Sequence, residues 1–289
     1  MRDTGYRILA DGVTVSNDTW VTGLGNHDLI IGPTGGGKTR GYVLPNLLSS
    51  QESFIVTDSK GTLRRQVGGI LERRGFQLLE LDFTDLLHSP WGYNPLRFIR
   101  YDMERECWNE QDIITVAAAL VPVEDKTQPF WEYAARNLLE ALIGYTLECL
   151  PAEEHDLTSV VRLFAEAETG VLDELMRELC TIDPDGFVAM RWKGIQTCRR
   201  ADKMYGSILG ILAQKISNFS FSGARELFTN SNQIDFASIS QEPTAVFLHV
   251  SDSDYSLANL TSLFYTQALQ ALIAEADKQP DNRLQIPVR

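Results

Sequence analysis

The expected fold rests on the segment Asp28–Thr39, which reads DLIIGPTGGGKT. Its last eight residues match the pattern G-x-x-x-x-G-K-[ST] of a phosphate-binding P-loop. Glycines permit a tight loop with positive φ, in which successive backbone N–H groups face phosphate oxygens. The apolar run Asp28–Ile31 predicts a buried strand before the loop. A helix is expected from Thr39 to Leu48, and Pro45 should kink or end it.

The loop predicts a site for ATP and Mg²⁺. Lys38 would neutralise the β- and γ-phosphates, and the Thr39 hydroxyl would complete a Mg²⁺ shell, so both are candidate catalytic residues. A Gly-rich turn without a ligand is the alternative, but the position between an apolar strand and a helix favours the P-loop. The candidate nucleotide-binding residues are Gly32, Pro33, Thr34, Gly35, Gly36, Gly37, Lys38, Thr39 and Arg40.

An NTPase also needs an acidic residue for Mg²⁺. Asp58 follows an apolar run and is the candidate that we pair with Thr39 as a metal ligand. Asp252 and Asp254 follow another apolar run and are alternatives. Helix capping would explain all three aspartates equally well. His249 lies within its apolar run and is expected to be a core histidine rather than a base.

Further apolar runs and helical patterns alternate along the chain. This order predicts a parallel α/β sheet. The expected strands are 53–58, 76–83 and 245–250, and the last residues, 284–289, resemble the opening of another. The expected helices outside the middle of the chain are 61–74, 204–216 and 257–277.

The middle of the chain differs in composition and in periodicity. Residues 101–190 hold 5 basic and 20 acidic side chains, whereas the flanking segments are nearly neutral and the whole chain has a net charge of −13. Apolar residues there follow helical spacing without a convincing strand. We therefore expect residues 1–100 and 204–289 to form a nucleotide-binding domain and residues 101–203 to form an inserted, all-helical acidic domain. A solvated helical bundle without chemistry of its own is the alternative for the insert.

Charge and cysteine content limit the function classes. The net charge argues against a broad DNA-coating surface but leaves room for a small basic track; the pairs Arg64-Arg65, Arg73-Arg74 and Arg199-Arg200 are candidates, or else solvated helix faces. The four cysteines form no CxxC pair, so neither a zinc site nor a disulfide framework is supported. The sequence shows no signal peptide and no apolar run of about 18 residues. We expect a reduced, cytoplasmic chain.

Several of these segments together resemble the type IV coupling proteins, the ring-forming ATPases of conjugation and type IV secretion. The segments that carry the resemblance are IGPTGGGKTRGYVLPNLL at 31–48, SFIVTDSKGT at 53–62, GYNPLRFI at 92–99, FSGARELFT at 221–229 and VFLHVSD at 246–252. Phe130-Trp131-Glu132, which leads into an apolar helix, fits the same pattern. The resemblance covers most of the chain.

The resemblance implies a RecA-like motor domain with an inserted all-helical domain. It also implies a homohexamer that hydrolyses ATP and moves single-stranded DNA or a relaxase–DNA complex toward a secretion channel. Relaxase or effector proteins and other type IV secretion components would be its partners, at the cytoplasmic face of the inner or plasma membrane. Gly32–Thr39 would bind nucleotide phosphates, and Asp58 and Lys60 would belong to a motif beside the site.

Two departures from the family pattern matter. Family members usually carry N-terminal transmembrane helices, and their Asp-Asp or Asp-Glu strand falls just after the segment matching Arg283–Arg289. We therefore expect a fragment that binds ATP and hydrolyses it poorly. The alternative function is a nucleotide-dependent receptor without hydrolysis, in which the acidic insert docks basic protein partners. A small-molecule P-loop kinase would need an Arg-rich lid and a compact acceptor site, and neither is visible.

Overall fold

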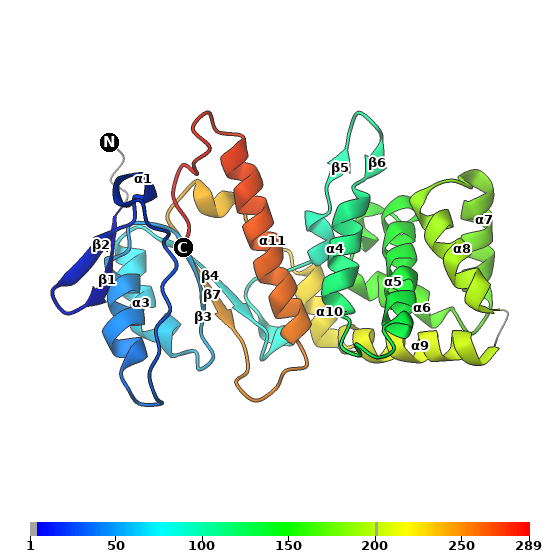
Figure 1. The fold of residues 1–289 in the computed structure, drawn as a ribbon, viewed down its shortest axis with the longest axis horizontal. Coiled ribbons are helices and arrows are strands. Elements are labelled where there is room, and N and C mark those ends of the chain that lie inside the picture. Colours follow the sequence, from blue (N-terminus) through cyan, green and yellow to red (C-terminus); the bar gives the residue numbers. More distant parts are fainter. Residues whose placement is uncertain (1–4, 200–201) are drawn as a thin grey trace. The chain divides into compact units, whose positions relative to one another are not determined.

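A computed structural model describes residues 5–199 and 202–289 of the chain. The chain divides into two compact units, both drawn in Figure 1. The sheet unit comprises Met1–Thr84, Ile234–Ser253 and Ala268–Arg289, and the helical unit comprises Asp85–Gln233 and Asp254–Gln267. The long helix α11 (Ala258–Asp277) contributes residues to both units.

The sheet unit is built on a parallel sheet with the strand order β3-β7-β4. All six residues of β7 are buried, as expected for an apolar strand covered on both faces. The α/β class and the parallel sheet predicted from the sequence are confirmed. The strands are β3 (Phe54–Thr57), β4 (Gln77–Asp82) and β7 (Thr244–His249).

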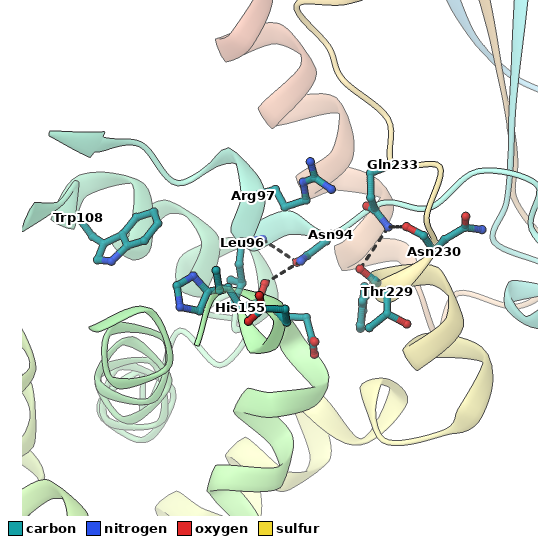
Figure 2. Close-up of a pocket in the computed structure, with 12 residues that line it drawn as sticks. Asn94, Leu96, Arg97, Trp108, His155, Thr229, Asn230 and Gln233 are labelled. Carbon is teal, nitrogen blue, oxygen red and sulfur yellow. Dashed lines mark hydrogen bonds between the residues drawn. The ribbon is translucent and has the colours of Figure 1, made fainter. Parts of the chain in front are cut away.

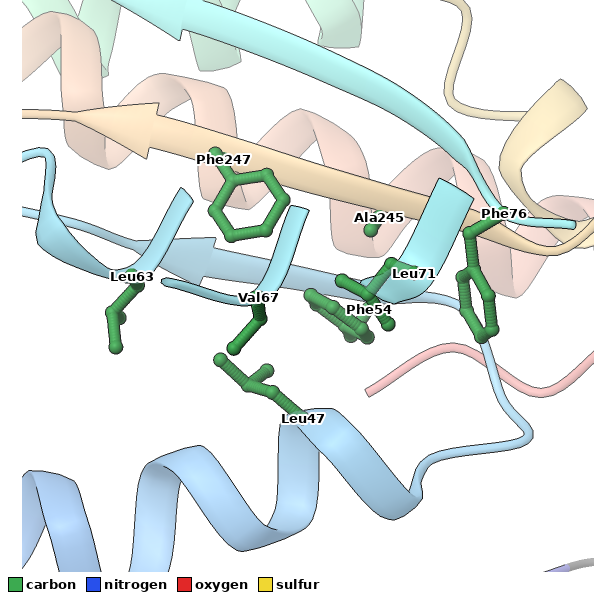
Figure 3. Close-up of a cluster of buried hydrophobic side chains, with 8 residues drawn as sticks. All are labelled: Leu47, Phe54, Leu63, Val67, Leu71, Phe76, Ala245 and Phe247. Carbon is green, nitrogen blue, oxygen red and sulfur yellow. The ribbon is translucent and has the colours of Figure 1, made fainter. Parts of the chain in front are cut away.

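One face of this sheet carries α2 (Leu44–Ser49) and α3 (Thr62–Arg73). In α3 the buried side chains Leu63, Val67 and Leu71 recur every four residues, so they line one stripe of the helix. Figure 3 shows Leu47 of α2 pointing toward this stripe. The core cluster consists of Leu47, Phe54, Leu63, Val67, Leu71, Phe76, Ala245 and Phe247.

The strand predicted at Asp28–Ile31 is wrong, because these residues have no regular secondary structure. Leu29 is 85% exposed and Ile31 is 86% exposed. A strand needs a neighbour to bond its backbone groups, and the segment beside β3 comes instead from the end of the chain. Arg289 donates its backbone N–H to the Ser53 carbonyl over 2.9 Å and continues the parallel bridge formed by Val288. The strand-like ending predicted at 284–289 is thus reduced to this short parallel pairing.

The helix after the P-loop changes type along its length. Thr39–Val43 (η1) is π-helical, and α2 follows without a gap. The Leu44 N–H bonds to the Thr39 carbonyl, five residues earlier. Pro45 lacks an N–H and would crowd the carbonyl four residues before it in a regular α-helix. The kink that the sequence predicts is therefore a π-helical turn just before Pro45.

An N-terminal hairpin precedes these elements and was not predicted. It pairs β1 (Tyr6–Ala10) with β2 (Val13–Ser16), and α1 (Thr19–Thr22) follows. The turn is Asp11-Gly12, with Gly12 at φ 71°. An Asp-Gly pair between residues of strand type is a strong hairpin signal, so the sequence did contain the information.

The helical unit packs around α5 (Phe130–Cys149), whose buried residues occur on all sides of the helix. Figure 1 shows α4, α6 and α8 around it. The other helices are α4 (Glu110–Leu120), α6 (Leu157–Ala165), α7 (Val171–Ile182), α8 (Phe187–Arg199), α9 (Asp202–Ile216) and α10 (Ser222–Thr229). Short helices are η2 (Leu86–His88), η3 (Pro95–Phe98), η4 (Ala152–Glu154), η5 (Ser217–Phe219) and, in the sheet unit, η6 (Ser238–Ser240).

Two details of the helical unit differ from the expectation. A small antiparallel pair, β5 (Tyr101–Asp102) with β6 (Cys107–Trp108), lies within the segment expected to be free of strands. The unit also begins at residue 85 rather than 101 and runs to 233 rather than 203. Contacts between distant residues explain this wider range. The Tyr93 hydroxyl donates to Gln267 Oε1 over 2.6 Å, and the Tyr93 N–H bonds to the Leu227 carbonyl.

Candidate functional site

The glycines of the P-loop motif in the sheet unit adopt backbone conformations that other residues rarely take. Gly35 and Gly37 have φ of 77° and 81°, which L side chains rarely adopt. The Gly36 N–H bonds to the Pro33 carbonyl over 3.0 Å, and a Cβ on Gly36 would lie 3.0 Å from that oxygen. The loop residues are exposed. Three consecutive glycines are thus required by conformation or by close contact, and the loop is open to a ligand.

Lys38 folds back over its own loop. Its Nζ donates to the carbonyls of Gly32 over 2.6 Å and of Pro33 over 3.0 Å. Both acceptors are neutral, whereas a phosphate would offer a charged acceptor and a stronger hydrogen bond. Thr39 begins the π-helical turn, and Arg40 follows on its exposed surface.

The helix after the P-loop runs in the same direction as α3. Its C-terminal end lies at the end of α3, because Arg74 donates to the Leu48 and Ser50 carbonyls over 2.5 Å each. Leu47 packs in the cluster that holds Val67 and Leu71. The N-terminal ends of both helices therefore point to the carboxyl edge of the sheet, where open α/β folds bind ligands.

Asp58 lies at this carboxyl edge, directly after β3, and is 2% exposed. Its Oδ1 accepts from the Thr62 N–H over 3.0 Å and its Oδ2 accepts from the Arg64 N–H over 2.9 Å. These two bonds satisfy amides in the first turn of α3. Asp58 thus has a capping role, and Lys60 in the same loop is exposed.

A buried histidine joins the ends of neighbouring strands at the same edge. His249 is 6% exposed; its Nδ1 lies 3.2 Å from the Asp58 carbonyl oxygen and its Nε2 lies 2.9 Å from Glu80 Oε1. The Arg64 Nε lies 3.3 Å from Glu80 Oε2. This arrangement braces the loop after β3, which agrees with a structural histidine.

The two other acidic candidates are exposed. Asp254 accepts from the Ser256 N–H over 2.9 Å, and this bonding lowers the pKa of Asp254. Asp252 is exposed as well. Of the predicted basic clusters, Arg65 donates to the Gly61 carbonyl and Arg199 pairs with Asp173, whereas Arg200 lies outside the described residues.

The helical unit contains a pocket of about 370 Å³ that the sequence did not predict (Figure 2). Its polar side chains mostly bond to the surrounding backbone: Asn94 donates to the His155 carbonyl over 2.7 Å, and Gln233 donates to three carbonyls. These bonds connect loops of the unit and leave few groups for a ligand. Across residues 5–199 and 202–289, no cluster of three His, Cys, Asp or Glu side chains could hold a metal ion.

Acidic side chains dominate the electrostatics of the helical unit. Several of its basic residues form ion pairs within the unit, as in Arg100–Asp112 at 2.8 Å, Arg191–Glu140 at 2.6 Å and Lys215–Glu124 at 2.7 Å. Glu148, near the end of α5, has its pKa raised to about 7 by partial desolvation and by the carboxylates of Asp183 and Glu110. The surplus negative charge therefore remains on the unit itself.

The helices in the described part of the chain include none that is long and apolar enough to cross a membrane.

Comparison with known proteins gives a family and a fold. Residues 3–288 match the family model described as Type IV secretory system Conjugative DNA transfer. The structure is similar to that of the unbound bacterial conjugative coupling protein TrwB, with 17% identity and a TM-score of 0.60 over 96% of this chain and 56% of that chain. The plasmid coupling protein TrwB in complex with the GTP analogue GDPNP also matches, with 15% identity and a TM-score of 0.46 over 98% and 63%.

A search among curated proteins gave no match. The chain spans little more than half the length of the first structure, and at 17% identity that likeness shows the fold alone. That fold is the RecA-like P-loop core expected from the sequence.

We predict that Asp58→Ala destabilises the fold even without metal. The substitution leaves two amides at the start of α3 without their buried acceptor, so the free energy of unfolding should fall by about 1–3 kcal/mol. Urea denaturation in the presence of EDTA measures this change. Asp252→Ala, at an exposed aspartate, is the control and should change stability by less than about 0.5 kcal/mol. Equal stability of Asp58→Ala and the unsubstituted chain would contradict the capping role.

We also predict a pH effect from Glu148. Its raised pKa means that the folded chain binds this proton more tightly than the unfolded chain does. The free energy of unfolding should therefore fall as pH rises from about 4.5 to 7, and Glu148→Gln should make this slope shallower. Urea denaturation at several pH values tests this, and identical slopes in the two proteins would contradict it.

Proposed function

Because the chain belongs to the family of type IV secretory system conjugative DNA transfer proteins, we propose that it is the nucleotide-binding part of a DNA-transfer motor. The P-loop carries this proposal: an exposed glycine cradle at the start of a helix, at the carboxyl edge of a parallel sheet. Such a helix start presents backbone N–H groups and a positive dipole to an anion.

Residues 32–39 would hold the phosphates of ATP. The geometry fits this ligand because Gly35 and Gly37 take positive φ, and because only neutral carbonyls accept from the Lys38 ammonium group among the described contacts. When phosphate is present, Lys38 would exchange these carbonyls for charged oxygens. Arg40, in the first turn after the loop, would lie close to the same phosphates.

Thr39 and Asp58 are the proposed Mg²⁺ ligands. Each carboxylate oxygen of Asp58 accepts one amide hydrogen, and a carboxylate has about four acceptor positions, so capping leaves room for a ligand role. Mg²⁺ would neutralise charge that develops on the phosphates. The helix cap keeps the Asp58 carboxylate in a fixed orientation.

In the whole protein, we propose that ATP hydrolysis drives single-stranded DNA or a relaxase–DNA complex toward the secretion channel. A homohexamer at the cytoplasmic face of the inner or plasma membrane, in contact with other secretion components, is the proposed assembly. The family match supports this proposal. The near-neutral charge of residues 1–100 and 191–289 is compatible with a DNA track.

A second candidate is a nucleotide-dependent receptor in which the helical unit docks relaxase or effector proteins. The observation in its favour is that residues 101–190 carry 20 acidic against 5 basic side chains, of which Arg105 and Arg162 pair with acidic side chains of the same unit. A basic partner would meet unneutralised carboxylates. Such docking would weaken with salt, because exposed charges are screened beyond about 10 Å at 0.1 M.

We predict that Lys38→Ala weakens ATP binding. The loss of one charge-assisted contact of about 1.5–3 kcal/mol corresponds to a rise of roughly 10- to 150-fold in Kd. Titration with a fluorescent ATP analogue and Mg²⁺ measures the affinity. Lys278→Ala is the matched control, since Lys278 is an exposed lysine of the same unit that pairs with Glu275. Equal affinity of Lys38→Ala and the unsubstituted chain would contradict the site.

The motor and the receptor predict different results for ATP turnover and for partner binding. The motor predicts ATP turnover that single-stranded DNA stimulates and Lys38→Ala abolishes. The receptor predicts no stimulation, but salt-sensitive binding of a basic relaxase in the presence of ATP. Turnover assays with and without DNA, and binding at two salt concentrations, separate them. A hexamer whose ATP turnover is not stimulated by single-stranded DNA would contradict the motor.

A further inference from the structure

A partly buried polar cluster connects the two sides of the P-loop. Asp28, four residues before the loop, accepts on Oδ2 from the Tyr42 hydroxyl over 2.7 Å; Tyr42 lies three residues after the loop. The Arg7 Nε lies 2.9 Å from the same oxygen. Arg7 and Asp28 have side chains that are 4% and 15% exposed. The carboxylate is thus shared by a cation from the hairpin and a hydroxyl from η1.

Arg7 is held in place by its surroundings. Its guanidinium donates to Asn26 Oδ1 over 2.7 Å and to the carbonyls of Ser16 and Gly25 over 3.4 Å each. These acceptors lie at the end of β2 and in the segment that leads to the loop. The position of Asp28 is therefore tied to the N-terminal hairpin.

The hairpin is also bonded to the helix after the loop. The Asn46 side chain pairs with the backbone of Ile8: its Oδ1 accepts from the Ile8 N–H and its Nδ2 donates to the Ile8 carbonyl, both over 2.8 Å. Asn46 Nδ2 also donates to the Tyr42 carbonyl over 2.8 Å. The hairpin thus contacts the chain on both sides of the loop.

The contact between Asp28 and Tyr42 joins the two ends of the segment that contains the P-loop, so the P-loop lies at the tip of a closed loop. Within it, Leu29 and Ile31 are exposed and lie outside any strand, so the sheet does not fix the entry to the loop. Burial and the neighbouring Asp28 raise the pKa of Tyr42, so its hydroxyl remains a donor at neutral pH. A flexible loop loses more entropy when it orders around a ligand than a loop whose ends are already held.

We propose that Arg7, Asp28 and Tyr42 are positioning residues that hold the two ends of the P-loop at the spacing that binds nucleotide. The hairpin β1–β2 then sets nucleotide affinity without touching the nucleotide. This inference rests on the proposed binding of ATP at residues 32–39.

The test is Tyr42→Phe in the whole chain, which removes one hydroxyl and keeps the ring. We expect the Kd for a fluorescent ATP analogue with Mg²⁺ to rise by about three- to tenfold, since part of one hydrogen bond to a charged group is lost. Tyr6→Phe is the matched control. Tyr6 lies in the hairpin β1–β2 and is 49% exposed, and its hydroxyl has no hydrogen bond among the described contacts. It should leave the Kd unchanged.

A second measurement separates loop positioning from general loss of stability. Without nucleotide, amide hydrogen exchange of residues 34–38 should be faster in Tyr42→Phe, while exchange in β7 should stay the same. Asp28→Asn should give a similar increase in Kd. In the double variant, the Kd should rise by less than the product of the two single increases, because both substitutions remove the same contact.

Unchanged affinity and unchanged loop exchange in Tyr42→Phe would overturn the inference. Faster exchange in β7 to the same degree as in the loop would also overturn it, because the effect would then be general destabilisation. If the unsubstituted chain bound no nucleotide, the proposed function would fail. The exchange measurement, which needs no nucleotide, would still decide whether the three residues order the loop.

Discussion

The packing of Leu47 against Val67 and Leu71 is the contact on which the geometry of the site depends. It attaches the helix after the P-loop to α3 and, through Phe54 and Phe247, to the sheet. Without a strand before the loop, this apolar contact and the Arg74 bonds to the neighbouring Leu48 and Ser50 carbonyls hold the C-terminal end of the helix in place. A phosphate site on a helix terminus requires a helix that cannot rotate, and burial of aliphatic side chains provides that.

Much of the sheet unit could be predicted because its signals are local. The helical spacing of Leu63, Val67 and Leu71 and the unbroken apolar run of β7 each specify an element from neighbouring residues alone. The P-loop is a local signal too, since its glycines reflect backbone conformations within a few residues. The hairpin at Tyr6–Ser16 has an equally local signal in its Asp-Gly turn.

The remaining features depend on contacts between distant residues. Residues 28–31 have the composition of a strand, but strand formation also requires a neighbouring strand, which no local pattern reveals. The beginning of the helical unit at residue 85 follows from the contacts of Tyr93 with Leu227 and Gln267. Arg7 and Tyr42 lie 21 and 14 positions from Asp28, and no periodicity connects them. The position of Asp58 in the sequence allows both capping and metal binding, and the bonds to Thr62 and Arg64 assign the capping role.

The exposed residues Leu29 and Ile31 have a consequence for the behaviour of the chain in solution. Trp20 and Val21 are each 78% exposed as well. Exposed apolar side chains of this kind favour association between chains. The net charge of −13 opposes clustering of the chains at low ionic strength, and added salt screens that repulsion. Colloidal stability of the isolated chain should therefore decline with ionic strength and with protein concentration. We therefore expect the least association of the isolated chain at low protein concentration and low ionic strength.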